Sequence, residues 1–129
     1  MPNIFGIGID IIEINRFSKI FKKNRSFKFR VFSKLEIKFC ENKKNKLSSY
    51  AKRFAAKEAF SKALGTGITN GLNFNEITVK NDTKGKPSIN LIGNSEKIVN
   101  KIIKRKKFNI FLSLSDEKKY AVAMIVITT

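Results

Sequence analysis

Apolar and polar positions recur along the chain with two different periods, and together these periods predict an α+β domain. Helical spacing marks segments at about 16–23, from Ser33 onward, at 47–64 and at 95–104. Alternation or short apolar runs mark strands at 4–11, 75–80, 88–92, 109–115 and 120–127. The predicted order is therefore a strand, three helices, two strands, a helix and two strands. No repeat or linker interrupts it, so residues 1–129 are expected to form a single domain.

Local signals set the limits of these elements. Ser33, followed three residues later by Glu36, has the capping-box pattern that starts a helix. Gly65 should end the long helix, because glycine readily adopts the left-handed conformation found after a helix. The lysine- and asparagine-rich stretch 42–46 is predicted to be a loop, and residues 81–87 should form the basic tip of a hairpin.

The long helix carries a concentrated polar face. At 100° per residue, Lys57, Glu58, Ser61 and Lys62 share one side of the helix. Alanines are frequent on the other side and allow close packing against a neighbouring element. The polar face has two interpretations: a solvated surface with weak pairs one turn apart, or a site for an anion and a metal.

Asp10 is the one acid within the apolar run 4–12, which is predicted to be a buried strand. A buried carboxylate must find a partner or lose its charge. If Asp10 and Glu58 meet in space beside basic groups, they suit Mg²⁺, which takes one or two carboxylates and completes its shell with water and phosphate oxygens. The alternative is that Asp10 caps the helix that starts near Glu13.

Composition excludes several kinds of chemistry. The 129 residues contain no histidine and one cysteine, Cys40, so histidine-dependent catalysis and an intrachain disulfide are excluded. A zinc site lacks its usual ligands, and a lone thiol suits a reducing compartment. The apolar run near the N-terminus is far shorter than the roughly 20 residues that span a bilayer. We therefore expect a cytoplasmic protein that does not enter a membrane.

The chain is strongly basic, with 27 Lys and Arg against 10 Asp and Glu. Such a surface should attract polyanions: nucleic acid, anionic lipid, a phosphate-rich coenzyme or an acidic protein. An AT-rich coding sequence explains a large share of this basicity, and the dense run 104–107 is interpreted as a solvated helix end. Charge alone therefore does not choose among the partners.

Several motifs occur together in a characteristic order. The segment Gly6-Ile7-Gly8-Ile9-Asp10-Ile11 is followed by Arg53-Phe54-Ala55-Ala56-Lys57-Glu58-Ala59 and then by Gly65-Thr66-Gly67-Ile68. With this order and spacing, the chain resembles the holo-[acyl-carrier-protein] synthases, the short type of 4′-phosphopantetheinyl transferase. The resemblance covers nearly the whole chain. It implies the α+β fold of that family, assembled as a homotrimer with active sites between subunits.

The resemblance also implies a reaction. The 4′-phosphopantetheine arm of coenzyme A would pass to a serine of an acidic apo-acyl carrier protein, with Mg²⁺ as cofactor and release of adenosine 3′,5′-bisphosphate, in support of fatty acid biosynthesis. Asp10 and Glu58 would hold the metal, and Glu58 or, as a weaker choice, Lys57 would accept the proton. Contacts with coenzyme A are expected from Arg53, Lys62, Gly65, Thr66, Gly67, Ser113, Ser115 and Asp116. Contacts with the carrier protein are expected from Arg16, Lys19, Lys23 and Arg25.

Other interpretations of these residues remain. Lys57 could be a charged anchor, Ser113 and Ser115 a plain strand face, and Lys19, Lys23 and Arg25 a solvated surface. Asp116 stands where many family members have a histidine, so that histidine's contribution must be replaced or lost. Two further functions are possible: a small basic nucleic-acid-binding module, which the charge favours, and an interaction subunit that has lost catalysis. We expect no specific nucleic acid partner.

Overall fold

The computed structural model describes residues 3–65 and 71–129 of the chain. In chain order, its elements are β1 (Ile4–Glu13), α1 (Ile14–Lys23), α2 (Arg25–Val31), α3 (Lys34–Glu41), α4 (Lys46–Leu64), the 3₁₀ turn η1 (Phe74–Glu76), β2 (Ile77–Asn81), β3 (Pro87–Leu91), α5 (Gly93–Ile103), β4 (Asn109–Asp116) and β5 (Tyr120–Thr128). This mixed α and β architecture confirms the predicted fold class.

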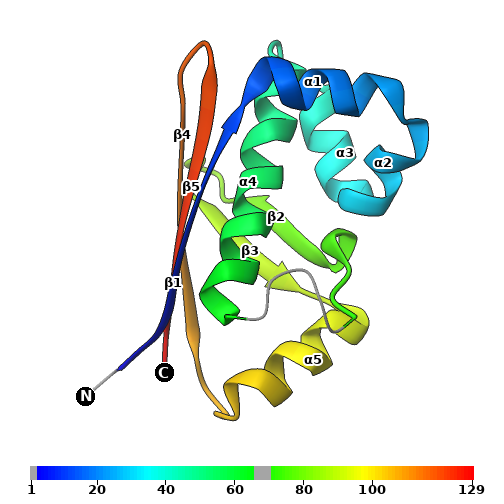
Figure 1. Ribbon diagram of the computed structural model, residues 1–129. Coiled ribbons are helices and arrows are strands. Elements are labelled where there is room, and N and C mark those ends of the chain that lie inside the picture. Colours follow the sequence, from blue (N-terminus) through cyan, green and yellow to red (C-terminus); the bar gives the residue numbers. More distant parts are fainter. Residues whose placement is uncertain (1–2, 66–70) are drawn as a thin grey trace.

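A three-stranded antiparallel sheet in the order β1-β5-β4 forms one side of the molecule, and α4 packs across its inner face (Figure 1). The β2-β3 hairpin forms a second sheet, and β3 runs beside β4. In the β1-β5 register, Gly8 pairs with Ile125 and Asp10 with Ala123. Because Ile125 and Ala123 are fully buried, Asp10 also faces α4.

Two glycines allow β1 to lie directly against α4. A Cβ atom on Gly6 would lie 1.8 Å from the carbonyl oxygen of Ala63, and one on Gly8 would lie 1.8 Å from that of Ala59. The small residues of α4, among them Ala55, Ala59 and Ala63, are buried in this contact. The strand that carries Asp10 is thus held close to the helix that carries Glu58.

The outer face of the β1-β5-β4 sheet is apolar and exposed. Ile7, Ile9 and Ile11 of β1 are 55%, 59% and 63% exposed, and Phe111 and Met124 also face outward. The prediction of a buried first strand is therefore wrong for the chain by itself. Only the face toward α4 is covered, as expected for an antiparallel sheet with one packed face.

Helices α1, α2 and α3 cover the far side of α4 (Figure 1), and their contact is largely aromatic. The ring centroids of Phe17 and Phe54 lie 5.6 Å apart, and those of Phe21 and Tyr50 lie 4.7 Å apart. The sequence prediction missed α2, a seven-residue helix that begins after Asn24, whose side chain accepts a hydrogen bond from the backbone of Ser26. Four helices, rather than the predicted three, therefore separate β1 from the hairpin.

Several predicted boundaries are confirmed. Ser33 and Glu36 make both hydrogen bonds of a capping box at the start of α3. Helix α4 ends at Gly65, which has a φ of 83°. Asp10 does not cap a helix: it lies within β1, and α1 begins at Ile14. Within the part of the chain that the structure describes, no helix is long and apolar enough to span a membrane.

Candidate functional site

Asp10, Glu58 and Lys62 form a compact polar group between β1 and α4. The Lys62 ammonium donates to Asp10 Oδ1 and to the carbonyl oxygen of Ile9, both at 3.0 Å. Burial raises the pKa of Glu58, the nearby charge of Asp10 raises it further, and Lys62 opposes both effects. The two acids predicted to meet are therefore neighbours, and one cation already partly balances their charge.

This donor set fits Mg²⁺ better than a metal that needs a closed protein shell. Two carboxylates that repel one another gain from a divalent cation placed between them, and Mg²⁺ commonly binds through two carboxylates, waters and substrate phosphates. Across residues 3–65 and 71–129, no group of three or more histidine, cysteine or acidic side chains gathers as a candidate metal site. Asp10 and Glu58 would therefore supply the protein ligands and leave positions for phosphate oxygens.

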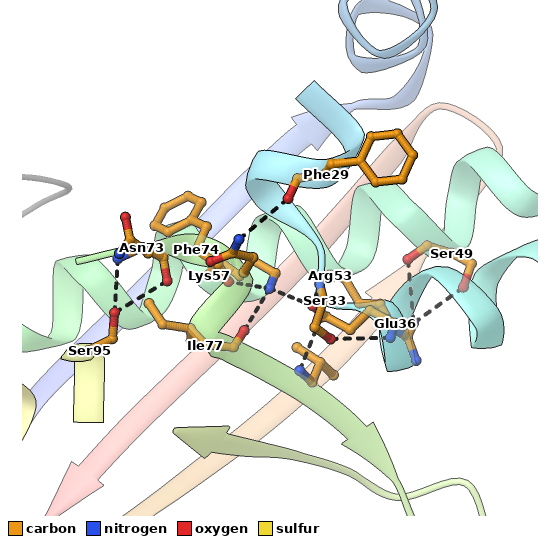
Figure 2. Close-up of polar contacts among 12 residues, drawn as sticks. Phe29, Ser33, Glu36, Ser49, Arg53, Lys57, Asn73, Phe74, Ile77 and Ser95 are labelled. Carbon is orange, nitrogen blue, oxygen red and sulfur yellow. Dashed lines mark hydrogen bonds and ion pairs between the residues drawn. The ribbon is translucent and has the colours of Figure 1, made fainter. Parts of the chain in front are cut away.

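Lys57, adjacent to Glu58 in sequence, is fully buried, and its side chain lies among Glu36, Phe74 and Ile77 (Figure 2). Its ammonium contacts Glu36 Oε1 at 2.7 Å and the carbonyl oxygens of Phe74 and Ile77 at 2.6 Å each. Burial lowers the pKa of Lys57 to about 8 although Glu36 opposes that shift. A lowered pKa would suit a base, but this nitrogen is fully buried and each of its three hydrogens has an acceptor.

The expectation that Lys57 accepts a proton is therefore wrong for this geometry. The interpretation of this helix face as a solvated surface is wrong as well, because Lys57 and Ser61 are buried. The charge on Lys57 joins α4 to η1, β2 and α3. Glu36 completes the connection, because its second oxygen accepts a hydrogen bond from the backbone of Val79 at 3.0 Å. Lys57 is thus a structural anchor in the core rather than a surface anchor.

We predict that Lys57→Met lowers the free energy of unfolding by about 3–5 kcal/mol, because it leaves the Glu36 carboxylate buried without its counter-charge. Urea denaturation measures this loss. The double variant Lys57→Met/Glu36→Gln should recover part of it, since the uncompensated charge is gone. Wild-type stability combined with lost catalysis in Lys57→Met would instead restore a catalytic role.

Arg53 lies at the floor of a second site, which we call the basic hollow. The residue is 2% exposed. Its guanidinium carbon lies 4.1 Å from the Phe39 ring centroid, and the group donates to Ser49 (Figure 2) and to the side chain of Asn81. Within the described residues, Arg53 Nε is buried without a hydrogen-bond partner. A guanidinium that lines a hollow raises the positive potential inside it and so suits an anionic ligand, while the shielded Nε is closed to direct contact.

The basic hollow has a volume of about 690 Å³ and is formed by four separate segments: the end of α3 with the following loop, the first half of α4, the β2-β3 turn and the end of β4. Its charged lining residues are Lys43, Lys44, Lys52, Arg53, Asp82 and Asp116. Cations outnumber acids in this lining. The hollow could therefore hold a phosphorylated ligand with polar groups at its other end.

The two sites lie on different sides of α4. Arg53 and Glu58 are five positions apart, which separates them by about 140° around a helix, and Arg53 contacts α3 and β2 whereas Glu58 lies near β1. Within one chain, Arg53 is therefore not brought to the Asp10–Glu58–Lys62 group. Gly65 lies at the end of α4, one turn beyond Lys62.

The remaining predicted coenzyme contacts are divided. Ser113 and Ser115 are exposed on the outer face of β4, whereas Asp116 lines the basic hollow. Thr66 and Gly67 lie outside the described residues. A single chain therefore collects only part of the predicted set into each site.

The four residues predicted to bind the carrier protein are all exposed, on α1 and at the start of α2. Arg16 lies at the rim of an apolar hollow of about 290 Å³ whose wall includes Ile20, Phe27 and Phe54. Lys19, Lys23 and Arg25 are not part of that lining. The structure thus distinguishes Arg16, which adjoins an apolar surface, from the other three.

Sequence reasoning missed Glu36 as the partner of Lys57, and missed Lys43, Lys44 and Lys52 as neighbours of Arg53. The sequence did contain a signal for the basic hollow, since both the 42–46 loop and the 81–87 tip are rich in lysine. Nothing in their spacing shows that the two segments meet beside Arg53.

Comparison with known proteins gives a consistent result. The family model of the 4′-phosphopantetheinyl transferase superfamily matches residues 6–125. A holo-[acyl-carrier-protein] synthase of Pelagibacter ubique is 54% identical over 124 residues, covering 96% of each chain. The crystal structure of the Neisseria meningitidis synthase has a TM-score of 0.85 at 33% identity, covering 97% of this chain and 98% of that chain. The Bacillus anthracis synthase, solved with CoA (3′,5′-ADP), has a TM-score of 0.80 at 38% identity, covering 98% and 97%.

Proposed function

Since the chain belongs to the 4′-phosphopantetheinyl transferase superfamily, we propose that it transfers the 4′-phosphopantetheine arm of coenzyme A to a serine of apo-acyl carrier protein. The reaction we propose depends on Mg²⁺, releases adenosine 3′,5′-bisphosphate and supplies fatty acid synthesis. The observation that carries this proposal is the pairing of Asp10 with Glu58 beside Lys62, because the reaction breaks a pyrophosphate bond between charged groups.

Asp10 and Glu58 would hold the Mg²⁺, which when bound supplies charge neutralisation at the pyrophosphate and at the departing bisphosphate. The Lys62 ammonium lies at the same place and carries hydrogens that can reach a phosphate oxygen. Glu58 is also the preferred acceptor for the serine proton. A carboxylate that binds a metal through one oxygen has a second oxygen to accept a proton.

The nucleotide end of coenzyme A would occupy the basic hollow, which Arg53 lines together with Lys43, Lys44 and Lys52. Because the basic hollow and the Asp10–Glu58–Lys62 group lie on different sides of α4, we infer that two subunits complete one active site. The exposed apolar face of the β1-β5-β4 sheet supports self-association, since such a face is typical of an interface. Sedimentation should show a trimer, and a monomer at assay concentrations would contradict this arrangement.

The hollow beside Arg16 supports docking of the carrier protein, since it offers an apolar surface next to an exposed cation. We predict that Arg16→Ala raises KM for the carrier protein about tenfold with little change in kcat, because the lost contact acts in docking rather than in chemistry. Lys97→Ala, which removes an exposed lysine of α5, is the matched control. Equal KM values for the two variants would contradict a specific role for Arg16.

Intact-mass analysis tests the proposed function. Apo-acyl carrier protein incubated with this protein, coenzyme A and Mg²⁺ should gain the mass of one phosphopantetheine. EDTA should prevent the gain, and so should replacement of the accepting serine by alanine in the carrier protein. Folded protein that gives no gain under any of these conditions would contradict the transferase proposal.

The nucleic-acid-binding alternative is weaker in view of the fold. Recognition of single-stranded RNA uses exposed aromatic rings on which bases stack. Here the ring pairs among α1, α2 and α4 belong to the core. The two most exposed rings, Phe29 and Phe111, belong to separate elements, α2 and β4, and do not follow one another along a single strand. The basic charge of the chain is consistent with an acidic protein partner and a phosphate-rich coenzyme.

A further inference from the structure

Asp116, which stands where many family members have a histidine, makes specific contacts with α4. The Ser48 hydroxyl donates to Asp116 Oδ2 at 2.6 Å, and the Lys52 ammonium contacts Asp116 Oδ1 at 3.1 Å. Ser48, Lys52 and Asp116 all line the basic hollow, as does Arg53. The carboxylate is thus held at the hollow between a buried hydroxyl and a lysine.

A carboxylate alone at this place would repel a phosphate group. The hydrogen bond from Ser48, and then the contact with Lys52, hold the pKa of Asp116 below its ordinary value of 3.8, so the group is charged at neutral pH. Lys52 balances that charge. An ammonium has three hydrogens, and the contact with Asp116 uses one. The Lys52 side chain is 29% exposed, so the rest of its donor capacity lies within reach of a ligand in the hollow.

We propose that Asp116 positions Lys52 to bind the 3′-phosphate of coenzyme A, so that an aspartate and a lysine together supply the cationic contact at the nucleotide end. This inference rests on the proposed function. The pyrophosphate is assigned to the Asp10–Glu58–Lys62 group on the other side of α4, which leaves the 3′-phosphate as the anionic group for the basic hollow. Lys52 is the binding residue, and Asp116 is a positioning residue.

The charge arrangement favours this assignment over direct binding by Asp116. A free aspartate could accept a hydrogen bond from a ribose hydroxyl or from the adenine amine. Here one carboxylate oxygen is engaged by Ser48 and the other by Lys52. Each oxygen keeps a second lone pair, but a phosphate oxygen is itself an acceptor, so the remaining hydrogens of Lys52 are the groups that can bind the phosphate.

Kinetics with two substrates test the proposal: coenzyme A and 3′-dephospho-coenzyme A, which lacks only the 3′-phosphate. Lys52→Ala should lower kcat/KM for coenzyme A by about tenfold, the size expected for one charge-assisted contact, and should leave kcat/KM for dephospho-coenzyme A unchanged. Asp116→Asn should lower kcat/KM for coenzyme A by a smaller factor, because Lys52 remains but is less well placed. Lys101→Ala, which removes an exposed lysine of α5, should retain the wild-type values of kcat/KM for both substrates.

Other outcomes would overturn the inference. Equal losses with both substrates would mean that Lys52 acts through structure, and a selective gain for coenzyme A in Asp116→Asn would mean that Asp116 repels the phosphate. Calorimetric binding of adenosine 3′,5′-bisphosphate and of AMP provides a readout that does not depend on turnover: Lys52→Ala should weaken only the first. If the wild-type protein transfers from neither substrate, the proposed function fails. If it transfers and the variants retain its substrate ratio, only the role of Lys52 and Asp116 fails.

Discussion

Asp10→Asn should lower the transfer rate by at least about 100-fold, because metal stabilisation of a developing charge contributes several kcal/mol and about 1.4 kcal/mol corresponds to a factor of ten. Glu58→Gln should have a loss of similar or larger size, since it removes both a metal ligand and the preferred proton acceptor. Both substitutions keep side-chain shape and remove a charge. The initial rate of holo-carrier-protein formation at saturating Mg²⁺ measures the effect.

The folded state should tolerate both changes. Asp10 repels Glu58, so removing either charge relieves that repulsion. In Asp10→Asn this gain is offset by the loss of the ion pair with Lys62, which is partly exposed and therefore weak. Thermal unfolding should therefore show wild-type or slightly higher stability. Glu96→Gln, which neutralises an exposed acid in the first turn of α5, is the matched control and should be fully active. Full activity of folded Asp10→Asn and Glu58→Gln would refute the assignment of these residues.

Gly8→Ala should strongly destabilise the fold. The new Cβ would lie 1.8 Å from the Ala59 carbonyl oxygen and 2.8 Å from its carbon, both backbone atoms of α4 that no side-chain rotation can move. Strand and helix would have to separate, and we expect a loss of at least about 3 kcal/mol in the free energy of unfolding. Urea denaturation measures it. Any folded fraction should also have weak activity, because Asp10 lies two residues further along the displaced strand.

Gly85→Ala is the matched control for this prediction. A Cβ at Gly85 meets no heavy atom within 4 Å, and its cost of about 1 kcal/mol should come only from the positive φ of 89°. If Gly8→Ala were no more destabilising than Gly85→Ala, the close contact between β1 and α4 would not be required for the fold.

The features predicted well from sequence are those coded by local signals. Helix α4 is long and periodic and ends at a glycine, and the Ser33–Glu36 capping box needs only residues three apart. Helix α2 was missed because seven residues hold too little periodicity to be distinguished from a loop. Local signals therefore identify the long or capped elements but not a helix as short as α2.

The contacts of the candidate site join residues that are far apart in the sequence, and local signals do not predict such contacts. An acid in an apolar strand requires a partner, but this left open whether Asp10 meets Glu58 or caps a helix, and it was the family resemblance that brought the two acids together. The sequence could not show that Lys57 turns inward, since its acceptors come from Glu36, Phe74 and Ile77, at least 17 positions away in the chain. The basic hollow was missed for the same reason, because four separate segments form it only after the chain has folded.

Calorimetric titration of Mg²⁺ tests the central claim most directly, which is that Asp10 and Glu58 are a metal site for phosphate chemistry. In the presence of coenzyme A, the wild-type protein should bind one Mg²⁺ per active site. Asp10→Asn and Glu58→Gln should lose this binding, and Glu96→Gln should retain it. Binding of Mg²⁺ by both site variants with wild-type affinity would contradict the account and place the metal elsewhere.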